Sequence, residues 1–110
     1  MIAPILGAWY IAYMRILALS TLCDFWETHP QAKTPLSNWY AEANGADWDT
    51  PEAIKAAHRH ASFLTDNRVV FNIKGNDYRL IVKVHYNRRM MFVRFVGTHK
   101  QYDAIDAERI

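Results

Sequence analysis

Cysteine is scarce in this chain of 110 residues, since Cys23 is the only one. A single thiol cannot form an internal disulfide or a cysteine-based zinc site, so on this count we expect a cytoplasmic protein without a metal. We expect no other cofactor. Glycine and proline number only four each, which excludes collagen-like and low-complexity chains. The hydrophobic fraction of 51% is enough for one modest core, and the sequence therefore predicts one folded domain.

Long apolar runs are also few, and the one at the start of the chain, residues 1–13, carries no charge. Arg15 interrupts this run before the roughly 20 residues that a membrane-spanning helix needs, and no positive charge precedes it as in a secretory signal. Three interpretations stay open: a tail that an upstream start codon adds to a protein beginning at Met14, a docked or oligomer-forming segment, and a weak membrane anchor. We expect residues 14–110 to form the domain, without stable membrane association.

Acidic residues are rare in one part of the chain. Residues 1–60 hold four Lys or Arg against six Asp or Glu, whereas residues 67–100 hold eight Lys or Arg and a single acid, Asp77. Concentrated charge of one sign in a small domain indicates a polyanionic partner. Nucleic acid is the first candidate, ahead of an acidic protein tail or a membrane surface.

Local signals divide the chain into a helical half and a strand half. Hydroxyl side chains that could cap helices stand at Ser20, Thr21, Thr34 and Thr50. The expected elements of the first half are a strand at 15–19 and helices at 20–27, 35–44 and 52–58. Apolar and polar residues then alternate, which predicts strands at 68–74, 78–86 and 90–97, followed by a short helix at 101–110. The expected fold class is α+β, a small antiparallel meander with the N-terminal helices packed on one face.

The alternation assigns the strand side chains to two faces. On the last strand, Met91, Val93 and Phe95 would point to the core. The opposite face would collect polar and cationic side chains, namely Arg68, Asn72, Lys74, Arg79, Lys83 and Arg94. These positions include no acid, and neighbouring strands lie about 5 Å apart, so the cations could converge on one or two phosphates. Ordinary surface charge is the alternative interpretation.

Two residues near the end of the last strand are candidates for chemistry. His99 is a histidine at a strand end, where its imidazole could transfer a proton to or from a substrate held over the sheet. Tyr102 could stack on a base or lend its hydroxyl, although a packing role is equally open. The other histidines lack the spacing of a zinc site and are expected on the surface or in packing.

The stretch from 67 to 103 contains NRVVFNIKGN, YRL and GTH..YD, and at these separations it resembles the HigB-type toxins of the RelE/ParE superfamily. The likeness extends back through SFL, ADW and the pattern MRI…STL…FWE…HP, and so spans nearly all of residues 14–106. The resemblance implies a RelE/ParE-like fold and the toxin of a type II toxin–antitoxin system. Such a toxin is a metal-independent endoribonuclease that cuts messenger RNA, usually on the ribosome, and thereby inhibits translation.

The resemblance also implies partners and site residues. A helix-turn-helix antitoxin of the HigA type would hold the toxin inactive, and operator DNA would be contacted only through that antitoxin. Arg79 in YRL matches the phosphate-binding arginine of the superfamily, while His99 and Tyr102 occupy its C-terminal catalytic region. The expected RNA-binding cations are Arg68, Lys74, Lys83 and Arg94. RelE itself lacks this histidine arrangement, so a role of His99 as acid or base follows from chemistry alone.

Two other functions stay open. A ParE-like protein would share the fold and poison DNA gyrase without cutting RNA, and a degenerate toxin would only bind RNA or repress its own operon with its partner. The GTH..YD ending and the cationic face favour cleavage.

Overall fold

The computed structural model describes residues 14–110, and the apolar segment 1–13, with its three open interpretations, lies outside the described residues. The elements follow in this order: β1 (Arg15–Leu17), α2 (Ser20–Thr28), the 3-10 turn η1 (Pro30–Ala32), α3 (Lys33–Asn44), α4 (Pro51–Ala57), β2 (Ser62–Phe63), β3 (Arg68–Ile73), β4 (Tyr78–His85), the 3-10 turn η2 (Tyr86–Arg88), β5 (Met90–Thr98) and α5 (His99–Asp103). Within residues 14–110, no helix has the length and apolar character needed to cross a membrane.

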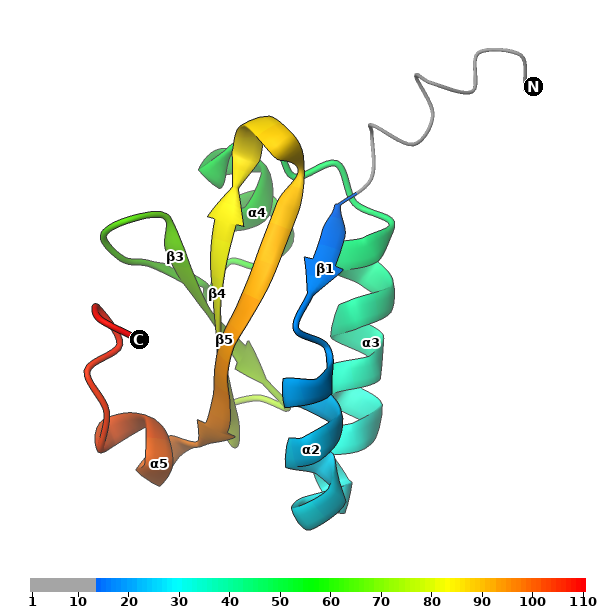
Figure 1. The fold of residues 1–110 in the computed structure, drawn as a ribbon, viewed down its shortest axis with the longest axis vertical. Helices are drawn as coiled ribbons and strands as arrows, with labels where there is room; N and C mark the ends of the chain where they lie inside the picture. The colour runs from blue at the N-terminus through cyan, green and yellow to red at the C-terminus, as the bar shows by residue number, and fades with distance from the viewer. Residues whose placement is uncertain (1–13) are drawn as a thin grey trace, which may run out of the picture.

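The strands form one sheet in the order β1-β5-β4-β3-β2. The three long strands pair antiparallel as a meander, β1 joins β5 in parallel, and β2 pairs with the start of β3. Figure 1 shows α2 and α3 side by side at one flank of the molecule and α5 at the opposite flank. The predicted α+β class is confirmed, and the predicted meander gains an additional strand at each edge.

The core lies between one face of the sheet and the helices. Leu36 and Trp39 of α3 and Ile54 of α4 are buried against this face. The ring centroids of Trp39 and Phe71 lie 5.4 Å apart in an edge-on arrangement. We call the side of the sheet that faces these helices the inner face, and the opposite side the outer face.

The starts of the helices agree only in part with the caps expected from the sequence. Thr50 caps α4 as predicted, because its Oγ1 accepts a hydrogen bond of 3.1 Å from the Ala53 backbone N–H. The cap expected at Thr34 is wrong: η1 leads directly into α3, which therefore begins at Lys33 and contains Thr34. The caps expected at the start of α2 are absent too, since Leu19 occupies the cap position without a side-chain hydrogen bond.

A bulge in β5 changes which of its side chains face the core. Val93 pairs with Val82 and Phe95 pairs with Ile81, so Arg94 is the additional residue. Beyond it, Val96 takes the inner position and is only 8% exposed. The prediction that Phe95 points to the core was wrong, because strict alternation does not anticipate a residue added to one strand.

The last helix is shorter and earlier than the predicted helix at 101–110. It begins at His99, because Thr98 caps it, and it ends at Asp103. The chain then returns to the start of β3, where Glu108 accepts hydrogen bonds from Thr65 and the carbonyl of Ile110 accepts one from Arg68.

Candidate functional site

Arg79 lies on the outer face near the start of β4, opposite Asn72 of β3 and Gly97 of β5. Its guanidinium carbon is 5.8 Å from the ring centroid of Tyr102, a cation–π distance. Its Nη1 donates to the carbonyl oxygen of Asn76 over 3.3 Å. Among residues 14–110 no carboxylate pairs with Arg79, so the rest of its donors can meet an anion.

A capping box fixes where α5 begins, at the end of β5. Thr98 Oγ1 accepts from the Gln101 backbone N–H over 3.1 Å, and Gln101 Oε1 accepts from the Thr98 N–H over 2.8 Å. This reciprocal capping box starts the helix at His99. Since His99 and Tyr102 are three residues apart, they lie on neighbouring positions of one helix face.

Asp103 holds the imidazole of His99. The Nδ1 atom of His99 is 3.1 Å from Asp103 Oδ2, one turn later on α5, and the His99 side chain is 53% exposed. A carboxylate at Nδ1 orients the ring and leaves Nε2 to exchange a proton with a substrate. Sequence reasoning named His99 as a candidate and did not name its partner Asp103, although the YD motif contains that residue.

Two of the other expected cations share one acid as their partner. Asp66 lies in the turn before β3, and its Oδ2 is 2.8 Å from Lys83 Nζ and 3.4 Å from Arg68 Nη1. The hydrogen bond and charge of Lys83, with a smaller effect of Arg68, hold the pKa of the Asp66 carboxyl below its usual value. The strand positions contain no acid, as the sequence shows, but the turn before β3 brings Asp66 back over the strand, where it pairs with both cations.

Arg68 differs further from expectation because it is buried. It is 8% exposed, and its Nε donates to the carbonyl oxygen of Ile110 over 2.9 Å. Lys74, at the turn after β3, pairs with Asp77 over 3.1 Å. Of the four cations expected to bind RNA, Arg94 alone is exposed at the bulge without a carboxylate partner in the described part of the chain.

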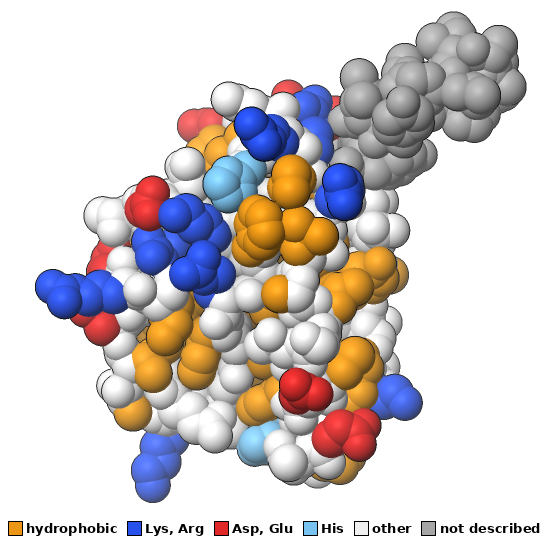
Figure 2. All heavy atoms as spheres, in the orientation of Figure 1, with side chains coloured by type: hydrophobic (Ala, Val, Ile, Leu, Met, Phe, Trp, Pro, Cys, Tyr) orange, Lys and Arg blue, Asp and Glu red, His pale blue; other side chains and the backbone are white. Residues whose placement is uncertain are grey.

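The outer face is therefore not uniformly cationic. Val70 and Ile81 lie in its middle and are buried, and Phe95 stands beside Ile81. Figure 2 shows Lys and Arg side chains gathered on one part of this side of the molecule, next to an apolar patch. Over residues 14–110, no three His, Cys, Asp or Glu side chains group closely enough to hold a metal ion.

The α+β fold, with helices packed on one face of a five-stranded mixed sheet, is consistent with the class of RelE-like toxins. The family HigB_toxin, described as the RelE-like toxic component of a toxin-antitoxin system, matches residues 32–105. The mRNA interferase toxin HigB of Escherichia coli strain K12 is 30% identical over 96 residues, which cover 86% of this chain and 92% of that protein. The mRNA interferase HigB of Escherichia coli O6:H1 is 23% identical over 94 residues, or 84% and 91% of the two chains.

This chain belongs to the HigB family of toxins. The predicted family is thus confirmed, and the predicted class of enzyme agrees with the names that these relatives carry.

Proposed function

We propose that this chain is the toxin of a type II toxin–antitoxin pair and acts as a metal-independent endoribonuclease on messenger RNA bound to the ribosome, which inhibits translation. The observation that carries the proposal is the end of the outer face, where the guanidinium of Arg79 lies against Tyr102 without a carboxylate partner among residues 14–110. Tyr102 shares α5 with the exposed His99. The names of the relatives support the same substrate.

The proposed reaction needs charge stabilisation and two proton transfers. The ribose 2′-oxygen attacks the adjacent phosphorus, so that a 2′-O–P bond forms and the P–O5′ bond breaks, leaving a cyclic phosphate and a 5′-hydroxyl. Arg79 binds the phosphate oxygens and stabilises the negative charge of the pentacovalent state. The proton of the 2′-hydroxyl must leave and the 5′-oxygen must gain one. His99, held by Asp103, can perform one of these transfers. Tyr102 supports Arg79 or stacks on a base.

The expected cations fall into three groups in this proposal. Arg94 contacts the RNA backbone beside the site, since it is exposed and free of a carboxylate among the described residues. Lys74 and Lys83 reach RNA only by leaving Asp77 and Asp66. Arg68 is buried and holds the C-terminal segment, so its contribution to RNA binding is indirect.

The proposed partner is a helix-turn-helix antitoxin of the HigA type. It would cover the cations at the site with an acidic or apolar segment, and operator DNA would be contacted only through it. The family description, a toxic component of a toxin-antitoxin system, supports an antitoxin partner.

The test is expression of the full chain in bacteria under a tight promoter, followed by mapping of new 5′ ends in cellular mRNA. We expect codon-linked breaks with the wild type. Arg79→Ala should lower the cleavage rate about 100-fold or more, because removal of one well-placed donor has an effect of this size. His99→Ala should have a smaller effect, since charge stabilisation is the larger requirement.

Arg109→Ala is the matched control, because the Arg109 side chain is 86% exposed near the end of the chain. It should cut like the wild type. Cleavage by purified protein with and without ribosomes tests the ribosome requirement. Absence of new mRNA ends, together with linear DNA from stalled gyrase, would replace the proposal with the ParE-like function, and full cleavage by Arg79→Ala would remove the assigned site.

A further inference from the structure

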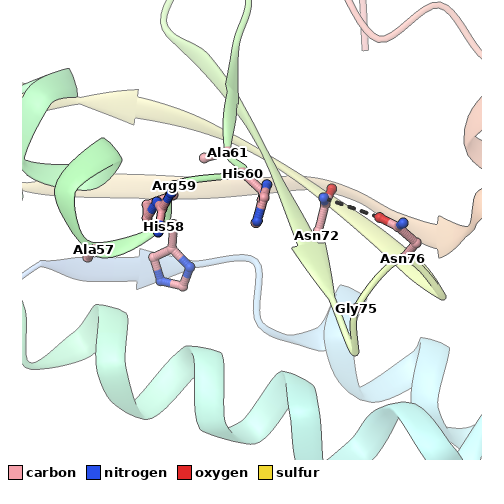
Figure 3. A pocket seen from close by; sticks show the side chains of 8 residues that line it. All are labelled: Ala57, His58, Arg59, His60, Ala61, Asn72, Gly75 and Asn76. Carbon is pink, nitrogen blue, oxygen red and sulfur yellow. Dashed lines mark hydrogen bonds between the residues drawn. The ribbon is translucent and has the colours of Figure 1, made fainter.

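A cleft of 490 Å³ opens at the edge of the sheet, beside the part of β3 that β2 does not cover. One wall is the segment after α4, and the other is β3 with the turn that follows it. Figure 3 shows the side chains that line it: Ala57, His58, Arg59, His60, Ala61, Asn72, Gly75 and Asn76. The size is within the range of pockets that hold small organic ligands.

The chemistry of the walls suits a nucleobase. Asn72 Nδ2 donates to Asn76 Oδ1 over 3.4 Å. The other side-chain amide atoms, Oδ1 of Asn72 and Nδ2 of Asn76, are left for a ligand. Arg59 and His60 are exposed on the opposite wall, and none of the lining residues is acidic. His58 is already engaged, because its Nε2 is 3.0 Å from Glu42 Oε1. A base edge presents donors and acceptors side by side, as these amides do.

The position of the cleft connects it to Arg79. Asn72 is the direct partner of Arg79 across the β3–β4 pair, and adjacent strands lie about 4.8 Å apart. The carbonyl of Asn76 accepts a hydrogen bond from Arg79. A nucleotide whose phosphate rests on Arg79 therefore has a neighbouring base within reach of the two amides.

We propose that this cleft is a nucleobase subsite, in which Asn72 and Asn76 recognise the base next to the scissile phosphate while Arg59 and His60 line the opposite wall. The inference rests on the proposed function, because it takes Arg79 as the anchor of that phosphate. Its consequence is that the two amides determine which base is preferred at one position beside the cut.

The first test compares base frequencies around the mapped mRNA cuts for the wild type, Asn72→Ala, Asn76→Ala and Asn87→Ala. Asn87 is the matched control, since it lies in the turn after β4 and lines a separate depression. We expect both cleft variants to lose about tenfold preference at one flanking position, and Asn87→Ala to keep the pattern of the wild type. Unchanged preference in both cleft variants would overturn the subsite.

The second test does not depend on cleavage or on how the variants fold. The four 5′-mononucleotides are added to the ¹⁵N-labelled full chain, and shifts of the backbone and side-chain amides are recorded. Shifts at His60, Asn72 and Asn76 that differ among the four bases support the subsite, and their absence overturns it. A wild type that binds nucleotides here but cuts no RNA removes the proposed function alone, whereas cutting with unchanged base preference in the cleft variants removes the subsite alone.

Discussion

Gly97 of the GTH motif occupies a position where any side chain would be crowded. A Cβ built on Gly97 would lie 2.5 Å from the ring of Phe95 and 2.9 Å from Gln101 Oε1. Gln101 Oε1 is the acceptor that binds the Thr98 N–H at the start of α5. The substitution Gly97→Ala must therefore displace Phe95, break the capping box, or do both.

We expect Gly97→Ala to lower the free energy of unfolding by about 1–3 kcal/mol, the usual effect of overpacking. For a domain of this size each kcal/mol lowers Tm by about 4–8 °C, so thermal unfolding followed by circular dichroism should show a drop of at least a few degrees. Because α5 carries His99 and Tyr102, mRNA cleavage below the new Tm should fall as well.

Gly45→Ala is the matched control for this experiment. A Cβ at Gly45 would meet its nearest atoms at 3.6 and 4.0 Å, which is ordinary contact, and the residue has φ −99°. The control should leave Tm unchanged or raise it slightly, because alanine reduces the entropy of the unfolded chain. Equal Tm values for the two variants would refute the argument that Gly97 provides the space for α5.

Two further predictions concern the helix caps and the C-terminal segment. Thr98→Ala and Thr50→Ala should each lower the free energy of unfolding by about 1 kcal/mol in urea titrations, because each removes a helix cap. Thr98→Ala should lower mRNA cleavage much more than Thr50→Ala, since the helix that Thr98 caps carries His99. Equal losses of cleavage in the two variants would contradict this. Hydrogen bonds from Thr65 hold the pKa of the Glu108 carboxyl below its usual value, as Lys83 does for Asp66. Both groups therefore add stability above their unfolded pKa values of about 4 and lose it as the pH falls through their lowered values. Between pH 6 and pH 2.5 the wild type should lose more stability than the double variant Asp66→Asn, Glu108→Gln, and parallel curves would refute the assignment.

The parts of the fold that follow from neighbouring residues could be predicted from the sequence. Thr50 followed by Pro51 gives the start of α4, because the cap bond joins residues three apart. The alternation of apolar and polar residues along β3 and β4 predicts two strands, because successive side chains of a strand point to opposite faces of the sheet. The Phe95 error has a different origin: the bulge depends on how β5 pairs with β4, and a single strand does not contain that information.

In the candidate site, too, residue identities could be predicted from the sequence, whereas contacts between distant segments could not. Arg79, His99 and Tyr102 were predicted from residue chemistry and resemblance, and the structure places Arg79 against Tyr102, with His99 on the same helix as that tyrosine. The contact between Asp66 and Lys83 could not be predicted, because the two residues are 17 apart in sequence and meet only when the turn before β3 folds back. The cleft beside Asn72 likewise joins two separate segments.

The ion pairs decide where the excess positive charge of residues 67–100 can act. Of the eight basic side chains in that segment, Arg68, Lys74, Lys83 and Arg89 pair with aspartates. The remaining four have no carboxylate partner among residues 14–110: Arg79, Arg88, Arg94 and Lys100. A paired cation attracts a polyanion less, because its partner opposes its field at a distance, and Asp66 offsets one of the two charges of Arg68 and Lys83. The attraction for RNA is therefore strongest around Arg79 and the bulge of β5 rather than over the whole outer face, which is why removing Arg79 should matter more than removing Lys83.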